Sequence, residues 1–301
     1  MADRIITDTS DFFTIGQGDI LSINNKYYKI TGHAKEMRFG LEDPKFWVKR
    51  AVDLDSGKKK IIKLSFLESF ETYLGGVKIK CYRSPNKEAQ ILKLVLNNPY
   101  FMQGESFNDP QGNNIRIIDV VRGLNFLFYI DSFKLKYEIY FEKVLPNILK
   151  EIIRCFEGIR YLHVNGYRHG DIRNDHLIKD EETGNLVWID FDYDFEAPEN
   201  PFSLDIFGLG NILIYAIGKG FHTYYMMKND VYTYKNIIDD LSLEDFALLD
   251  KRRFINLRKI YPIIPKSLNN VLLHFSQGTD VYYEFVDEII EDLNRCLYEF
   301  H

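Results

Sequence analysis

The hydrophobic pattern of this chain changes its period at about residue 143. Before that point, short apolar runs alternate with turn residues, which is typical of strands joined by tight turns. Beyond it, apolar residues recur at helical spacing, first in residues 145–166, a segment that ends at Gly166. The order is therefore strands with one helix, then a mostly helical half. It predicts an α+β fold in two parts, residues 1–131 and 132–301.

The local signals divide these two parts into elements. Asn24-Asn25 predicts a hairpin within residues 19–31, and Ser84-Pro85 predicts the start of a helix. Everything from about residue 203 onward reads as helical. The remaining predicted elements are strands at 46–54 and 59–66, a helix over 84–96, strands at 115–121 and 124–130, and a short hairpin formed by 176–180 and 185–191.

Composition excludes several classes of protein. The chain has 301 residues, of which 46% are hydrophobic, so it can bury an ordinary core. No apolar run reaches the ~20 residues that span a membrane, and the N-terminus does not read as a signal peptide. The net charge of -6 argues against nucleic-acid binding. Cys81, Cys155 and Cys296 have no metal-type spacing, which favours reduced thiols and a cytoplasmic location.

Five segments carry residue types that phosphoryl transfer needs: a lysine for nucleotide phosphates, carboxylates for magnesium, and a carboxylate that orients the nucleophile. In chain order they are IIKL (61–64), KEAQILKL (87–94), YLHVNGYRHGDIRNDHL (161–177), NLVWIDFDYDF (185–195) and SLDIFGLGNIL (203–213). Together they resemble the protein-kinase-like fold superfamily, in an atypical bacterial-type serine/threonine form, over about residues 28–215. The resemblance implies a bilobal fold, with a β-rich N-lobe holding one helix and a mostly helical C-lobe. It also implies ATP and Mg²⁺ as cofactors.

Carried over residue by residue, the resemblance implies a catalytic set. Lys63 would hold the α- and β-phosphates, fixed by an ion pair with Glu88; the alternative for both is a solvated surface. Asp171 would accept or orient the proton of the acceptor hydroxyl, or else be a turn aspartate. Arg173 sits where many kinases have a lysine that reaches the γ-phosphate.

The same resemblance implies a metal ligand and a structural support. Asp190 would be the main magnesium ligand. Asp205, on the helix that contains Gly210, would accept hydrogen bonds from backbone N–H groups near His169. His169 itself is expected to pack against Phe191.

Nucleotide contacts are expected from two further places. Gly32 and Gly40 bound the segment TGHAKEMRFG, which would cover the phosphates with help from Lys35 or Arg38. This segment lacks the full glycine pattern of a kinase. Three residues around the end of the predicted strand 124–130 complete the set: Tyr129, Ile130 and Asp131.

Two positions depart from the protein-kinase pattern. His176 stands where a kinase has the asparagine that binds a second magnesium, and imidazole is a poor ligand for a hard cation. A histidine at that place is similar to the bacterial lipopolysaccharide-core sugar kinases, although the rest of the loop is not. Asp192 replaces the glycine of D-F-G and could add a carboxylate near the metals. His176 and Asp192 therefore join Asp190 as candidate metal ligands.

The sequence leaves two functions open. The first is an ATP- and magnesium-dependent phosphotransferase whose hydroxyl acceptor is a protein serine or threonine or a small molecule. The second is a pseudokinase that acts as a nucleotide-binding or scaffold module. Only fourteen residues, FDYDFEAPENPFSL, separate Asp190 from Asp205. This is too short for a phosphorylation-dependent activation loop, and its hydroxyls are Tyr193 and Ser203, the latter expected to cap the following helix.

Overall fold

The computed structural model describes residues 4–38, 41–230, 234 and 237–300. The chain forms two compact units. The first unit comprises Met1–Ser69 and Tyr82–Val121, and the second comprises Phe70–Cys81 and Arg122–His301. This division differs from the predicted one in two ways, because the boundary falls after residue 121 rather than 131 and because residues 70–81 belong to the second unit.

The first unit is built on a seven-stranded sheet in the order β1-β2-β3-β4-β5-β9-β8. β1 pairs with β2 in parallel, and the other neighbours are antiparallel. Side chains such as Leu21, Ile30 and Ile62 are fully buried in its core. The elements of this unit are β1 (Ile5–Ile6), η1 (Phe12–Thr14), β2 (Ile20–Ile23), β3 (Lys26–Arg38), β4 (Leu41–Asp53), β5 (Lys59–Lys63), α1 (Pro85–Leu94), β8 (Gly104–Asn108) and β9 (Asn114–Asp119).

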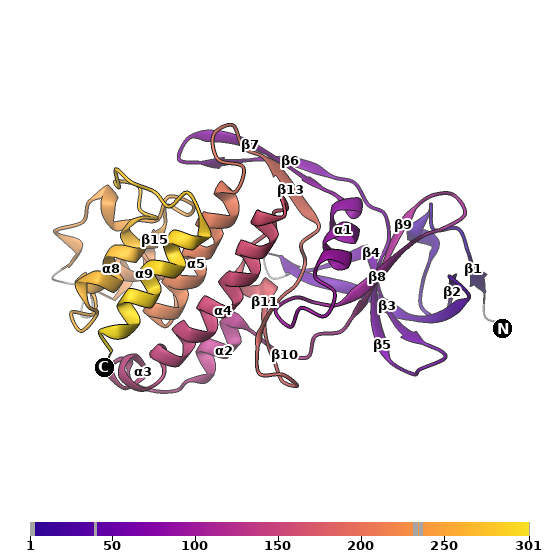
Figure 1. The fold of residues 1–301 in the computed structure, drawn as a ribbon, viewed down its shortest axis with the longest axis horizontal. Coiled ribbons are helices and arrows are strands. Elements are labelled where there is room, and N and C mark those ends of the chain that lie inside the picture. The colour runs from indigo at the N-terminus through magenta and orange to yellow at the C-terminus, as the bar shows by residue number, and fades with distance from the viewer. Residues whose placement is uncertain (1–3, 39–40, 231–233, 235–236, 301) are drawn as a thin grey trace. The chain divides into compact units, whose positions relative to one another are not determined.

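Local signals explain the hairpins and the helix of this unit. Asn24 and Asn25 both have left-handed φ angles, 48° and 62°, so they form the tight turn predicted between β2 and β3. The predicted strand at 46–54 lies in β4 as far as Asp53, and the predicted strand at 59–66 is found as β5, which ends at Lys63. The Ser84 hydroxyl accepts a hydrogen bond from the Lys87 N–H and caps α1, which packs against β8 and β9 (Figure 1).

The predicted strand at 124–130 is wrong. β10 (Gly123–Asn125) ends there and α2 (Phe126–Ser132) begins, with the Asn125 side chain accepting a hydrogen bond from the Phe128 N–H. A short apolar run fits a strand or a buried helix equally well, and the cap at Asn125 decides between them.

The second unit is mostly helical. The predicted amphipathic helix is α4, and it packs against α5 and α9, while α8 contacts both of these (Figure 1). α5 is buried at every position from Asp205 to Gly218, which makes it the central helix of this unit. Among the helices that the structure describes, none combines the length and the apolar character needed to cross a membrane. The helical elements are α2, α3 (Tyr137–Lys143), α4 (Leu145–Val164), η2 (Asn174–His176), α5 (Ser203–Gly218), α6 (Tyr224–Asn229), η3 (Leu243–Asp245), η4 (Leu257–Lys259), α8 (Lys266–Leu273) and α9 (Val286–Tyr298).

Small sheets complete the second unit. The predicted short hairpin is found as β11 (Leu177–Asp180) and β12 (Leu186–Trp188), and β11 also pairs with β10. β14 (His222–Thr223) pairs with β15 (Arg253–Phe254), so the prediction that everything after residue 203 is helical is wrong in this detail. A third sheet has the order β13-β7-β6 and was not predicted. Its strands are β6 (Ser69–Leu74), β7 (Val77–Arg83) and β13 (Tyr193–Glu196).

Candidate functional site

A buried cluster of three charges lies in the first unit. The Lys63 Nζ is 2.7 Å from Oε1 of Glu88, so the predicted ion pair is present. The Arg116 Nε lies 3.1 Å from Oε2 of the same carboxylate. The side chains are 4% exposed for Lys63 and 0% for Glu88 and Arg116, so the cluster is shielded from bulk water.

Strand register explains why two cations share one carboxylate. Lys63 on β5 lies directly opposite Arg116 on β9 in the antiparallel ladder, and α1 presents Glu88 to both. Arg116 also donates to the backbone carbonyls of Asn114 and Leu64. We did not predict Arg116 from the sequence. The only signal is a single cation inside the apolar strand IRIID, since a buried strand tolerates arginine only when the charge is paired.

The predicted phosphate-covering segment is a β-ribbon rather than a loop. Gly32 lies in β3 at a break in register, with φ at 150°, and the ribbon continues to Arg38 and returns from Leu41. Lys35 forms an ion pair with Glu42 across the ribbon. Gly40 lies outside the described residues.

The three residues predicted around the end of the strand 124–130 have structural partners in the second unit. Tyr129 donates a hydrogen bond to Glu151, Ile130 is fully buried, and Asp131 accepts one from Tyr215. These residues belong to helix α2 rather than to the end of a strand. Their nucleotide contact stays a prediction without structural support.

The loop that precedes Asp171 is held by a buried carboxylate. Asp205 accepts hydrogen bonds from the N–H groups of His169 and Gly170 at 2.7 and 2.8 Å, as predicted, and lies 2.9 Å from Nε2 of His163. Burial alone would raise the pKa of Asp205, but the His163 hydrogen bond and the nearby imidazoles outweigh it and lower the pKa. His169 packs edge-on against Phe191, which confirms that expectation too. The loop therefore has a fixed shape.

His176 lies between the two predicted functional carboxylates. Its Nδ1 is 2.9 Å from the backbone oxygen of Asp171 and 3.4 Å from Oδ2 of the same residue. Its Nε2 is 3.7 Å from Oδ2 of Asp190. Since a carbonyl oxygen only accepts, Nδ1 carries a proton and Nε2 faces Asp190. The second unit thus brings Asp171 and Asp190 to opposite edges of one imidazole.

The environment of Asp171 raises the pKa of its carboxyl. Burial raises the pKa of this carboxyl, and the charges of Asp190 and Asp192 raise it further, against the lowering effect of His176 and Arg173. Arg173 is turned toward Asp175, with Nε 3.0 Å from Oδ1, and its guanidinium is 4.0 Å from Asp171. Arg173 therefore contributes a positive charge beside Asp171.

Asp190 combines an uncommon backbone conformation with a partly exposed carboxylate. Its φ is 59°, an uncommon backbone conformation for a residue other than glycine, and its side chain is 33% exposed. Oxygen ligands of this kind suit Mg²⁺, which usually takes only one or two carboxylates beside phosphate oxygens. Asp192 is buried. Among the described residues, no three carboxylate, histidine or cysteine side chains are grouped to hold a metal by themselves.

The segment after Asp190 is tied down by strand pairing and charge. β13 is hydrogen-bonded to β7, and Tyr193 packs edge-on against Phe70 of β6. The Arg168 Nε lies 2.7 Å from Oδ1 of Asp194. Ser203 is the first residue of α5 rather than its cap, which corrects the predicted capping role.

A polar hollow of about 780 Å³ lies next to Asp171 in the second unit. Asp171 and Arg173 line it together with Phe70, Thr72 and Cys81 of the β6–β7 hairpin. Burial, with the charges of Asp171 and Asp194, raises the pKa of the Cys81 thiol to about 11, so this thiol stays protonated. The hollow combines a candidate base with polar and aromatic walls, as small-molecule sites do.

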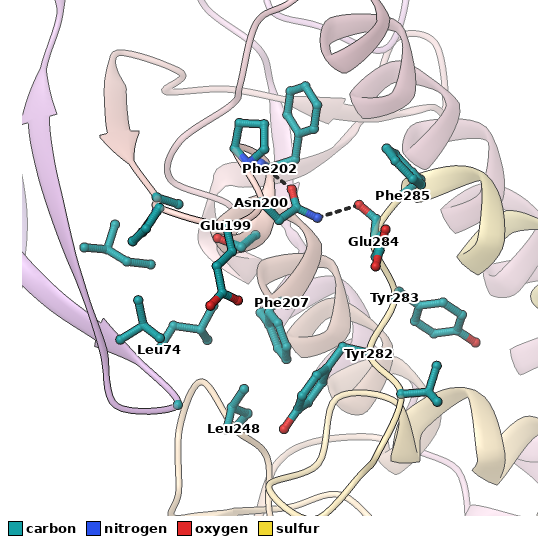
Figure 2. Close-up of a pocket in the computed structure, with 18 of the residues that line it drawn as sticks. Leu74, Glu199, Asn200, Phe202, Phe207, Leu248, Tyr282, Tyr283, Glu284 and Phe285 are labelled. Atoms are coloured by element: carbon teal, nitrogen blue, oxygen red, sulfur yellow. Dashed lines mark hydrogen bonds between the residues drawn. The ribbon is translucent and has the colours of Figure 1, made fainter.

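A second hollow has a volume of about 710 Å³, and many of its lining side chains are apolar (Figure 2). Leu74 of β6, Leu248 and Tyr282 line it, and the Asn200 amide donates to the Glu284 carbonyl at its rim. A Cβ at Gly75 would lie 3.2 Å from the Leu248 side chain, so the turn of the β6–β7 hairpin sits directly on Leu248. This contact supports the hairpin.

Comparison with protein-family models gives no match for this chain, and comparison with curated proteins gives none either.

Proposed function

We propose that this chain is a protein-kinase-like phosphotransferase that moves the γ-phosphate of ATP to a hydroxyl acceptor with the help of Mg²⁺. The observation that carries the proposal is the pair of carboxylates, Asp171 and Asp190, held 3.4 and 3.7 Å from the two nitrogens of His176. The buried Lys63–Glu88 pair and the Asp205 contacts to the loop agree with the same assignment. The α+β order of elements is compatible with a kinase-like architecture.

Each residue has a definite task in the proposed reaction. The acceptor hydroxyl oxygen attacks the γ-phosphorus, the bond from the γ-phosphorus to the bridging oxygen breaks, and ADP leaves. Asp171 orients the hydroxyl and takes its proton, for which the raised pKa makes it a better base than an ordinary aspartate. Lys63 holds the α- and β-phosphates, and Arg173 stabilises charge on the transferred group. Asp190 ligates magnesium, which when bound neutralises phosphate charge.

A pseudokinase is the second candidate, and His176 is the observation that favours it. The imidazole has no oxygen to offer where a kinase has asparagine, and its Nδ1 already contacts the Asp171 carbonyl. A protein with this site could bind nucleotide and still fail to turn it over.

One experiment separates these functions. Thermal stabilisation by ATP is measured with and without Mg²⁺, alongside ATP turnover, for the full chain and for Asp190→Asn. An active enzyme shows magnesium-dependent stabilisation and turnover, and Asp190→Asn weakens the magnesium-dependent part more than the magnesium-free part. Asp55→Asn, an exposed carboxylate in the β4–β5 turn, is the control. Stabilisation by ATP without turnover supports the pseudokinase. If ATP gives neither stabilisation nor turnover, both proposed functions are refuted.

A further inference from the structure

The polar hollow beside Asp171 has a strongly charged lining. It contains four cationic side chains and three carboxylates. The cations are Arg173, Lys251, Arg252 and Arg253, and the carboxylates are Asp171, Asp175 and Asp250. Arg173 is paired with Asp175, so the remaining excess of positive charge lies in residues 250–253.

Residues 250–253 form a compact cationic group on one wall. The Asp250 carboxylate accepts from Arg252 at 2.9 Å and lies 3.1 Å from Nε of Arg253, so two guanidinium groups share one negative charge. Arg253 is held over the ring of Phe221, 3.9 Å from its centroid. Burial lowers the pKa of Arg253, which indicates that its charge is poorly solvated. A partly desolvated cation beside a cavity favours an anionic ligand.

The other walls limit the size of what can bind. They come from separate segments of the second unit, including the β6–β7 hairpin, the start of α2 at Leu127, and α5 at Leu204 and Asn211. Phe70, Thr72 and Leu74 alternate along β6, so one face of the hairpin lies toward this unit. An open hollow of about 780 Å³ with walls from these segments suits a compact small molecule.

We infer that this hollow binds the phosphate acceptor, and that the acceptor is a small hydroxy compound carrying an anionic group, a carboxylate or a phosphate. Its hydroxyl lies toward Asp171 and its anionic group binds Arg252 and Arg253. The role as acceptor rests on the proposed function, whereas the binding of an anionic polyol does not. Thr72 and Phe70 of the hairpin then set the size limit.

The test begins with equilibrium binding and uses no nucleotide. Glucose, gluconate and glucose 6-phosphate are titrated into the full chain by calorimetry. These probes have the same carbon skeleton and differ in the anionic group, so they also distinguish a carboxylate site from a phosphate site. At least one anionic probe should bind roughly tenfold or more tightly than glucose, the usual effect of a charge-assisted hydrogen bond. Equal binding of all three, or binding of none, overturns the inference.

Variants locate the site. Arg253→Gln should remove most of the preference for the anionic probe, and Arg252→Gln part of it. Arg252 is 84% exposed, so its variant tests the site even if Arg253→Gln does not fold. Thr72→Trp should weaken binding of every probe by filling the hollow. Arg295→Gln, at an exposed arginine of α9, is the matched control and should bind like the parent protein. The inference is overturned if Arg252→Gln keeps the full preference for the anionic probe and a folded Arg253→Gln keeps it too.

A second arm follows the label from γ-labelled ATP into the same probes and into a serine/threonine peptide mixture. Transfer to an anionic probe supports the inference. Transfer to peptides alone overturns it and leaves the proposed function standing. Binding of an anionic probe by a protein that does not turn over ATP overturns the proposed function and supports the ligand site.

Discussion

The two groups of charged residues that the sequence predicts for phosphoryl transfer are held in opposite ways. Lys63, Glu88 and Arg116 lie in regular elements and are almost fully buried, and the two cations share the Glu88 carboxylate by direct contact. Asp171 and Asp190 lie in loops, with side chains 23% and 33% exposed, and a single imidazole separates them. The first group is therefore a rigid scaffold, whereas the second keeps carboxylate oxygens accessible to a ligand.

Replacing Asp171 should give the largest effect on activity. Asp171→Asn is expected to lower turnover by about 10²–10⁴-fold, the usual contribution of a positioned base, with little change in nucleotide affinity. Turnover is measured at saturating ATP and magnesium, and affinity by titration. A large loss of ATP binding would instead make Asp171 a metal ligand or a structural residue.

The same variant should not lose stability at neutral pH. Because the folded-state pKa of Asp171 is raised, the folded protein binds more protons than the unfolded chain between the ordinary and the raised pKa. Stability therefore falls as pH rises through that window, and the penalty is fully present above it. Asp171→Asn removes the penalty, so denaturant unfolding at pH 7 should show equal or greater stability. Asp55→Asn is the control, and clear destabilisation by Asp171→Asn alone would contradict this account.

The scaffold was easier to predict than the reactive group, for a physical reason. Strand pattern and the Ser84-Pro85 start signal place Lys63 on a strand and Glu88 on a helix, and regular elements with apolar neighbours leave few ways to pair them. Arg116 was not predicted because the register of β5 with β9 places it opposite Lys63, and periodicity does not encode that register. The motif position of His176 linked it to Asp171 and Asp190, but its place between the two carboxylates depends on tertiary contacts that no local pattern encodes.

Two other differences have local causes. The run LNFLFYI is equally apolar as strand or helix, and the cap at Asn125 turns it into α2. The β6–β7 hairpin was not predicted, although Gly75-Gly76 is a turn signal and β7 largely alternates between buried and exposed residues. Its pairing with β13, more than a hundred residues later, could not be read from local pattern.

Replacing the two cations of the scaffold, Lys63 and Arg116, should affect stability equally but turnover differently. Lys63→Met and Arg116→Met should both destabilise the protein by about 3 kcal/mol, since each breaks a buried ion pair. Only Lys63→Met should also lower turnover, by roughly 10²-fold or more, because Arg116 is committed to backbone carbonyls. Stability is measured by denaturant unfolding. Turnover is measured at a temperature at which both variants are folded. Equal turnover in the two would remove Lys63 from the phosphate site.

His176 should have a smaller effect than either carboxylate. His176→Asn replaces the imidazole by an oxygen ligand that suits magnesium, so activity at high magnesium should stay the same or rise severalfold. The measurement is turnover against magnesium concentration for both proteins. Complete inactivation of a folded His176→Asn protein would show that the imidazole between Asp171 and Asp190 has a task of its own.

Phosphorylation of the segment after Asp190 should have no effect on turnover. In a regulated kinase, a phosphate pairs with arginine to order this segment. Here Asp194 supplies a permanent carboxylate to Arg168 at 2.7 Å, and β13 is already hydrogen-bonded to β7. Turnover should therefore be the same before and after phosphatase treatment of protein incubated with ATP.

Asp194→Asn tests the same idea from the other side, because it removes the charge without touching Asp171 or Asp190. It should loosen the segment, seen as faster amide exchange over residues 193–196. Phosphate found on Tyr193 or Ser203, with activity falling when it is removed, would show that this region switches as a kinase loop does.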